Sequence, residues 1–296
     1  MIEVRALTKR FGPVNAVSEL SFTAADGRVT GFLGPNGAGK TTTLRAALGL
    51  VRPTAGEVLF DGRRYAELRA PARQIGAGLE ASSFHPGRTA LAHLECLAAG
   101  MGLRRARCLE VLELVGLANQ AKRRVGGYSL GMRGRLQVAA ALLGDPWTLL
   151  LDEPTNGLDP EGITWMRTLV RALAGQGRTV LISSHLLGEV EQTVDDVVIV
   201  ARGRLVRSSS LAELERLSEP STVVAAADPA ALAALAARQG WDATAQPDGS
   251  LLVRGVEAAG VGRAALAAGL ALTHLAGRKA SLEQTFFQLT EGGGLE

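Results

Sequence analysis

Residues 34–41 read Gly34-Pro35-Asn36-Gly37-Ala38-Gly39-Lys40-Thr41, between an apolar stretch from Arg28 to Leu33 and a segment with helical character from Lys40 to Gly49. The spacing is that of the nucleotide phosphate loop, G-x-x-x-x-G-K-[ST], which joins a strand to a helix. Glycines let the backbone wrap closely enough for successive N–H groups to point at one anion, and the helix N-terminus adds partial positive charge there. We therefore predict an α/β fold that binds a nucleotide.

Two side chains of this loop have separate predicted roles. Lys40 supplies a positive charge to the β- and γ-phosphates, and the hydroxyl of Thr41 is placed to ligate Mg²⁺. ATP and Mg²⁺ are therefore the expected ligands. The loop residues expected to bind ATP are Gly34, Pro35, Asn36, Gly37, Ala38, Gly39, Lys40, Thr41 and Thr42.

A second apolar run, Thr148 to Leu151, ends in Asp152 and Glu153. Ligands of open α/β sheets bind at the carboxyl ends of the strands. We expect Asp152 to hold Mg²⁺ directly or through water, and Glu153 to orient or deprotonate the water that attacks the γ-phosphate. An apolar run that ends in two acids is common and need not be catalytic, but its combination with the phosphate loop favours hydrolysis.

A third apolar run, Thr179 to Ile182, is followed by Ser183, Ser184 and His185. If this strand lies beside the one that carries Glu153, His185 can sense the γ-phosphate or hold the attacking water. The other three histidines lack such a position and are interpreted as surface or core residues.

The rest of the chain predicts two domains. Short strands are predicted within residues 1–80, at Met1 to Ala6, Glu19 to Thr23, Arg28 to Leu33 and Gly56 to Asp61. A helical pattern from Ala90 to about Leu143 forms an insertion into the α/β core. After residues 218–221 the order of elements is βαββαβ, with a hairpin at Asp248-Gly249 and a final helix whose capping box is formed by Ser281 and Gln284. We predict a nucleotide-binding domain over residues 1–217, its helical subdomain at about 82–146, and a small α+β ferredoxin-like domain over 218–296.

Composition excludes several classes of protein. The 32 Lys+Arg against 29 Asp+Glu are a weak excess, which does not indicate a nucleic-acid partner. Two cysteines, Cys96 and Cys108, cannot build a disulfide framework, so a reduced, cytoplasmic protein is expected. No apolar run reaches the length of a membrane span, and the first residues are typical of a strand rather than a signal peptide. A membrane role would therefore depend on another chain.

The segment Tyr128-Ser129-Leu130-Gly131-Met132 resembles the signature motif of ABC-transporter ATPases. The resemblance extends over about residues 1–205. It includes Asn156-Gly157-Leu158-Asp159, which is similar to the D-loop, and His185, which is similar to the switch histidine. Phe11 falls where the family has an aromatic residue that stacks on adenine, although a phenylalanine near a strand end is equally often a core residue.

The resemblance implies an ABC-type P-loop NTPase in which two cassettes pack head to tail. The signature residues Ser129, Leu130, Gly131 and Met132 of one cassette would then face the nucleotide of the other. Within this segment, Ser129 and Gly131 would contact the γ-phosphate held by Lys40 of the other cassette. Ser129 also suits the N-cap of a helix from Leu130 to Leu143, which would offer free N–H groups to an anion. The implied partners are a second copy of the chain, expected as a homodimer, and integral-membrane permease subunits, with no nucleic acid. The implied location is the inner face of the cell membrane.

Two positions depart from the family pattern. Glu80 stands where most ABC cassettes have the glutamine of the Q-loop, and we assign it to the metal with Thr41 and Asp152. Gly134 lies inside the predicted signature helix, where the family commonly has glutamine. A glycine within a helix costs about 1 kcal/mol relative to alanine. Glu80 and the Ser-Leu-Gly-Met sequence resemble the bacitracin-resistance branch of exporters, which implies export of an antibiotic or a similar small molecule.

Two other functions are open at this point. A soluble ABC ATPase could act on nucleic acid or ribosomes, although such relatives usually carry two cassettes, long coiled coils or zinc-binding cysteines. A nucleotide-binding regulator without turnover is the other alternative, and the presence of both Glu153 and His185 argues against it.

Overall fold

The computed structural model describes residues 1–79, 84–217 and 220–278, which form two compact units. The first unit comprises Met1–Leu211 and the second begins at Ala212. Helix α8 (Leu211–Leu217) therefore starts the second unit, whereas the predicted boundary follows it. Each unit has its own buried apolar cluster.

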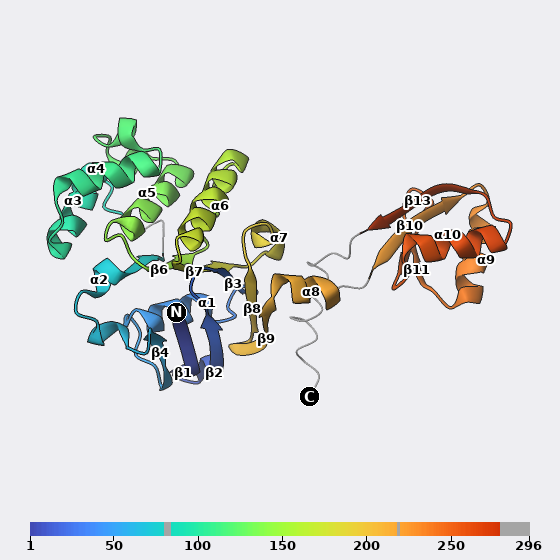
Figure 1. The fold of residues 1–296 in the computed structure, drawn as a ribbon, viewed down its shortest axis with the longest axis horizontal. Coiled ribbons are helices and arrows are strands. Elements are labelled where there is room, and N and C mark those ends of the chain that lie inside the picture. The colour runs from blue at the N-terminus through green and yellow to red at the C-terminus, as the bar shows by residue number, and fades with distance from the viewer. Residues whose placement is uncertain (80–83, 218–219, 279–296) are drawn as a thin grey trace. The chain divides into compact units, whose positions relative to one another are not determined.

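A six-stranded sheet forms the centre of the first unit (Figure 1). Its order is β5 (Ile75–Gly78), β6 (Thr148–Asp152), β7 (Thr179–Ser184), β3 (Val29–Leu33), β8 (Asp196–Ala201) and β9 (Arg204–Ser210). The first five strands are parallel and β9 is antiparallel to β8. All residues of β3, β6 and β7 are buried, which explains why these strands are uninterrupted apolar runs. Their carboxyl ends meet at one edge of the sheet.

Three strands form a separate antiparallel sheet in the order β2 (Val14–Ala24), β1 (Ile2–Phe11), β4 (Ala55–Phe60). Strands β1 and β2 are longer than predicted, because they continue through register shifts at which Ala6 and Glu19 have positive φ. These irregularities interrupt the alternating pattern by which a strand is recognised in a sequence. The rings of Phe22 and Phe32, 5.1 Å apart, connect this sheet to the central one within the same apolar cluster.

The predicted helical insertion is present and its three longer helices lie together in Figure 1. They are α3 (Ala90–Met101), α4 (Arg105–Leu114) and α5 (Leu130–Leu142). Four short helical segments also belong to the first unit. Between β4 and β5 lie η1 (Tyr65–Glu67) and α2 (Pro71–Gln74), and between α4 and α5 lie η2 (Ala118–Gln120) and η3 (Val125–Gly127). Helices α1 (Lys40–Ala47), α6 (Pro160–Gly175) and α7 (Leu187–Val190) follow β3, β6 and β7 in the chain.

The second unit contains β10 (Ser221–Ala226), α9 (Pro229–Gln239), β11 (Asp242–Ala245), β12 (Leu251–Arg254), α10 (Ala258–Ala267) and β13 (Leu272–Arg278). The sheet is antiparallel, in the order β11-β12-β10-β13. The order of elements along the chain is the βαββαβ order expected from the sequence, while the ferredoxin-like assignment stays a prediction. The expected final helix, with Ser281 and Gln284, lies outside the described residues.

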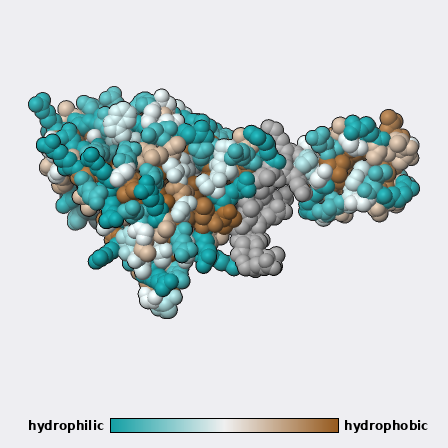
Figure 2. All heavy atoms as spheres, turned by 60° about the horizontal axis from the view of Figure 1, so that its bottom comes forward, coloured by the Kyte–Doolittle hydropathy of each residue, from teal (hydrophilic) through white to brown (hydrophobic). Residues whose placement is uncertain are grey.

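No helix of the described part of the chain is both long enough and apolar enough to cross a membrane. On the face shown in Figure 2, hydrophilic residues cover most of the first unit and apolar residues form separate small patches.

Candidate functional site

The loop that joins β3 to α1 is held in its shape by close backbone packing. A Cβ atom on Gly34 would lie 2.3 Å from the carbonyl oxygen of Val200. Gly39 has φ 98°, and a Cβ atom there would lie 2.5 Å from the carbonyl oxygen of Ala16. Both positions therefore require glycine, which explains the spacing of the motif.

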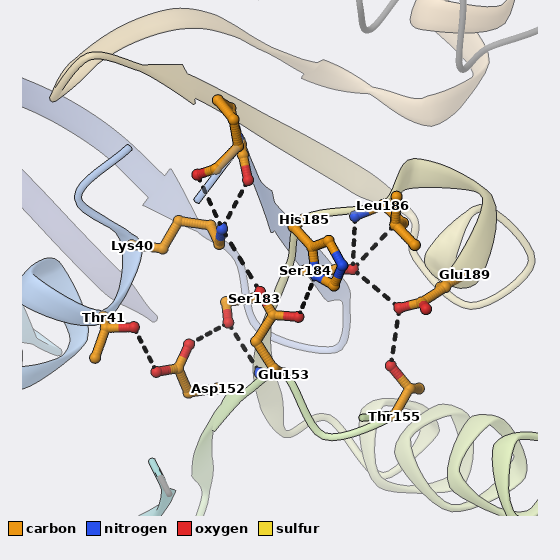
Figure 3. A network of polar contacts seen from close by, with 12 residues as sticks. Lys40, Thr41, Asp152, Glu153, Thr155, Ser183, Ser184, His185, Leu186 and Glu189 are labelled. Carbon is orange, nitrogen blue, oxygen red and sulfur yellow. Dashed lines mark hydrogen bonds and ion pairs between the residues drawn. The ribbon is translucent and has the colours of Figure 1, made fainter. Parts of the chain in front are cut away.

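The amino group of Lys40 is buried inside this loop, since the residue is only 6% exposed. Its Nζ donates hydrogen bonds to the carbonyl oxygens of Gly34 at 2.6 Å and Pro35 at 3.3 Å. It also lies 3.6 Å from Oε1 of Glu153. Figure 3 shows the ammonium group between the loop carbonyls and the Glu153 carboxylate.

Asp152, at the end of β6, is buried and accepts hydrogen bonds from two hydroxyl groups. Thr41 Oγ1 donates to its Oδ2 at 2.7 Å, and Ser183 Oγ donates to its Oδ1. Ser183 belongs to the neighbouring strand β7, so the carboxylate is fixed between α1 and β7. A hydroxyl and a carboxylate are the hard oxygen ligands that suit Mg²⁺, which takes few ligands from the protein itself.

Glu153 and His185 follow the adjacent strands β6 and β7, and their side chains meet. Nδ1 of His185 lies 2.7 Å from Oε2 of Glu153. In the tautomer that carries its proton on Nδ1, the imidazole donates this hydrogen bond to the carboxylate. The backbone N–H of Glu153 donates to Oγ of Ser183 at 3.0 Å and to its carbonyl oxygen at 3.2 Å.

The side chains of Lys40, Thr41, Glu153 and His185 border one cavity of about 450 Å³. It is lined by Asn36, Gly37, Ala38, Gly39, Lys40, Thr41, Thr42, Glu153, Asn156 and His185. The structure thus brings the phosphate loop together with the ends of β6 and β7, as the sequence predicted. Gly34 and Pro35 contribute carbonyl groups behind Lys40 instead of lining the cavity.

Phe11 lies at the end of β1 and is half exposed, with Nζ of Lys9 4.7 Å from the centre of its ring. The structure therefore excludes the alternative interpretation of Phe11 as a core residue. The ring is accessible to a flat ligand, although it does not line the cavity described above.

The signature segment lies apart from this cavity in the same chain. Among the described residues that line the cavity, none comes from Ser129–Met132. Ser129 is the N-cap of α5, as predicted, and its Oγ accepts a hydrogen bond from the N–H of Met132 at 3.2 Å. Leu130 packs against Gly157, where an added Cβ would lie 2.1 Å from the leucine side chain. Asp159 caps α6 through its contact with the N–H of Gly162.

Sequence reasoning missed four polar contributors to the site. Ser183 fixes Asp152 and the backbone of Glu153, while Ser184, Thr155 and Glu189 form a hydrogen-bonded group behind His185 (Figure 3). Serine and threonine at strand ends carry no distinctive pattern, so only the adjacency of β6 and β7 reveals them. Glu80, which we assigned to the metal, lies outside the described residues. Within the described part of the chain, no group of three or more His, Cys, Asp or Glu side chains could hold a metal ion.

Each of the two parts of the chain matches a known protein family. Residues 17–156 match the ABC transporter family, and residues 220–283 match a domain of unknown function, DUF8746. The chain belongs to the ABC transporter ATP-binding family, and the predicted P-loop NTPase fold is confirmed. It is an ATPase cassette.

Among curated proteins, the chain is similar to the bacitracin transport ATP-binding protein BcrA of Bacillus licheniformis, with 42% identity over 73% of this chain and 72% of the relative. The BcrA of Enterococcus faecalis is 34% identical over 100% of this chain and 98% of the relative. The lantibiotic transport ATP-binding protein SrtF of Streptococcus pyogenes is 35% identical over 74% of this chain and 95% of the relative. The predicted resemblance to the antibiotic-exporter branch is confirmed.

Solved structures give the same result. The ATP-binding subunit of an ABC transporter is 27% identical, with a TM-score of 0.66 over 73% of this chain and 92% of that structure. A cassette solved as a dimer in a post-hydrolysis state with ADP and phosphate is 25% identical, with a TM-score of 0.65 over 71% of this chain and 99% of that structure. The comparisons do not support the alternative of an ATPase that acts on nucleic acid or ribosomes.

Proposed function

We propose that this ATPase is the ATP-hydrolysing subunit of an antibiotic exporter. It works as a homodimer with ATP bound between the two copies. At the inner face of the cell membrane, it drives transport by separate membrane permease subunits. The observation that carries the proposal is the position of the Glu153 carboxylate. It lies between Lys40 and His185, in the cavity lined by the phosphate loop.

ATP binding follows from the contacts of the loop. The N–H groups of residues 36–42 and the start of α1 attract the phosphates, and Lys40 exchanges its bonds to the loop carbonyls for bonds to phosphate oxygens. Phe11 would stack on the adenine.

Thr41 and Asp152 are the described residues that would hold Mg²⁺: Thr41 lines the cavity, and its hydroxyl lies 2.7 Å from the carboxylate of Asp152. When bound, the ion neutralises charge on the phosphate oxygens.

Glu153 is proposed as the base for hydrolysis. Its carboxylate accepts a proton from a water molecule as the water oxygen forms a bond to the γ-phosphorus. The bond from the γ-phosphorus to the bridging oxygen breaks, and ADP and phosphate are released. His185 keeps the carboxylate oriented through its bond from Nδ1 to Oε2. Lys40 stabilises the negative charge of the γ-phosphate.

The dimer is proposed from the separation between the signature segment and the cavity. Ser129 and Leu130 are exposed and do not line the cavity of their own chain. Ser129 and Gly131 of one copy would contact the γ-phosphate held by Lys40 of the other. ATP then has a higher affinity for the closed pair than for separate copies, so hydrolysis favours opening.

The cargo and partners are proposed from the relatives. Two of the similar proteins are bacitracin transport proteins and one is a lantibiotic transport protein, so an antibiotic peptide is the proposed class of cargo. Affinity purification of this chain from solubilised membranes should recover an integral-membrane permease. The control is an ABC cassette that does not bind this permease.

One experiment tests whether the ATP site is formed by residues of both copies. Glu153→Gln should retain ATP, lose hydrolysis and elute as a dimer from gel filtration only when ATP is present. Adding Ser129→Arg should abolish the dimer, while ATP affinity of the single chain is unchanged. Ser208→Arg, at an exposed serine of β9, is the matched control and should leave the dimer intact.

The outcomes of this experiment separate the two parts of the proposal. A Glu153→Gln chain that turns over ATP normally would remove Glu153 from the chemistry. A dimer that persists in the Glu153→Gln, Ser129→Arg double variant would remove the signature segment from the interface.

A further inference from the structure

A single carboxylate oxygen joins the two segments that carry Glu153 and His185. Thr155 Oγ1 donates a hydrogen bond to Oε2 of Glu189 at 3.2 Å, and Ser184 Oγ lies 3.3 Å from the same oxygen (Figure 3). Thr155 closely follows Glu153 in the loop after β6, and Ser184 directly precedes His185 at the end of β7. Glu189 therefore contacts both segments from α7.

The hydroxyl of Ser184 also fixes the backbone on the far side of His185. Its Oγ accepts a hydrogen bond from the N–H of Leu186 at 3.1 Å, and its one proton is shared between the carbonyl oxygen of Leu186 at 3.0 Å and Oε2 of Glu189 at 3.3 Å. Ser184 is fully buried, where a hydroxyl group without partners is unfavourable. The Ser184 hydroxyl thus stabilises the turn that contains His185, and the same hydroxyl contacts the carboxylate of Glu189.

Glu189 itself occupies a fixed position. Its neighbours in α7, Leu187 and Val190, are 1% and 2% exposed, so the short helix is anchored in the core. Glu189 does not line the cavity, and its side-chain hydrogen bonds within the described part of the chain involve Thr155 and Ser184 rather than Glu153 or His185. Glu189 is therefore linked to Glu153 and His185 through the two segments that it contacts.

We propose that Glu189 is a positioning residue for ATP hydrolysis, which aligns His185 with Glu153 by bonding Ser184 and Thr155 to one carboxylate oxygen. This inference rests on the roles proposed above for Glu153 and His185. Without the carboxylate, the turn around His185 and the loop after Glu153 lose their common partner. The 2.7 Å contact between His185 and Glu153 is then less populated, whereas the phosphate loop is unaffected.

The test compares kinetic constants of the full-length chain. Glu189→Ala should lower kcat by about 10- to 100-fold, the range expected when reacting groups are misplaced by up to about 1 Å, with KM for ATP and nucleotide affinity unchanged. Glu189→Gln should keep a kcat close to the wild type, because its carbonyl oxygen can still accept from both hydroxyls. Thr155→Val should lower kcat in the same way, and Thr155→Ser should restore it.

A double variant tests whether Glu189 acts through the histidine. In a His185→Ala background, Glu189→Ala should have little further effect on kcat, because the side chain to be positioned is already missing. Two variants serve as matched controls, and both should keep wild-type kcat. Glu191→Ala removes a carboxylate that makes neither of these contacts, and Thr164→Val removes an exposed hydroxyl bonded within α6.

Three results would overturn the inference. The first is wild-type kcat in both Glu189→Ala and Thr155→Val. The second is an equal loss in Glu189→Gln and Glu189→Ala, which would mean that charge matters rather than hydrogen bonding. The third is a parallel loss of nucleotide affinity, which would indicate a general structural role. If Glu153→Gln abolishes hydrolysis while the Glu189 variants are normal, only this inference fails; if Glu153→Gln turns over normally, the proposed function fails first.

Discussion

Glu153 has a backbone conformation that side chains rarely adopt, with φ 49°. Two hydrogen bonds from its N–H to Ser183 hold this conformation at the point where β6 ends. Residues in such conformations concentrate at functional sites, because the surrounding structure must stabilise them. The bend allows the carboxylate to reach both Lys40 and His185.

Lys40→Ala should weaken ATP binding by roughly 10- to 150-fold, since it removes a charged hydrogen bond worth about 1.5–3 kcal/mol. Isothermal titration calorimetry with ATP measures the change. Lys122→Ala, at an exposed lysine of the helical insertion, is the control and should bind ATP as the wild type does. Unchanged affinity in the Lys40 variant would contradict the assignment of the phosphate loop.

Asp152→Asn should raise the Mg²⁺ concentration needed for half-maximal hydrolysis by roughly 10- to 100-fold, the range found when partners of a bound metal are removed. The amide keeps the shape of the carboxylate, and it can still accept from Thr41 or Ser183, but it lacks the negative charge. A magnesium titration of ATPase activity measures the effect. An unchanged requirement would exclude Asp152 from the metal site.

Residues within one contiguous motif could be predicted, whereas residues that act across strands could not. Lys40 and Thr41 follow from the spacing of the glycines, and Asp152 and Glu153 follow from an apolar strand that ends in acids. Ser183 and Glu189 make their contacts only because β7 pairs with β6 and α7 reaches the loop that follows β6, long-range contacts that no local pattern encodes.

At the scale of the helix, α5 contains a glycine that the fold does not require. A Cβ on Gly134 would lie 3.8 Å from the side chain of Leu158, an ordinary contact distance. Gly134→Ala should therefore raise the free energy of unfolding by about 0.5–1 kcal/mol, because alanine loses less backbone entropy in a helix. Urea denaturation measures this change, and a decrease in stability would contradict it.

Gly39→Ala is the opposite case, because this glycine is the N-cap of α1 with φ 98° and an added Cβ would lie 2.5 Å from the carbonyl oxygen of Ala16. The left-handed conformation alone should destabilise the protein by about 1–2 kcal/mol, and the clash adds to it. ATP affinity should fall as well, since the start of α1 must move. Stability and affinity equal to those of the wild type would show that the loop can rearrange.

The accuracy of the predicted elements depended on the signals at their ends. The signature helix begins where Ser129 caps it and ends within one residue of the expected position. Strands β1 and β2 extend well beyond their predicted bounds, because bulges at Ala6 and Glu19 hide the continuation of each strand.

At the scale of the molecule, the second unit contributes no described residue to the lining of the nucleotide cavity. Its own core consists of Val224, Ala226, Leu232, Val253 and Val261. The Enterococcus faecalis relative matches the whole chain, so a region corresponding to this unit is present there too. The two units therefore have separate cores.

A chain that ends after Leu217 should bind ATP with the affinity of the full chain, because the phosphate loop and the ends of β6 and β7 all belong to the first unit. Calorimetry on both chains at the same salt concentration measures this. A changed affinity in a truncated chain with normal circular dichroism would mean that the second unit acts on the nucleotide site.

The hydrogen bonds from Lys40 to the carbonyls of its own loop have a consequence for the catalytic cycle. The loop keeps its curvature by internal bonds, so it does not have to fold around each arriving ATP molecule. When ADP leaves, the lysine can return to these carbonyls. Turnover by the proposed dimer would then involve the association and separation of two subunits without any refolding of the pocket.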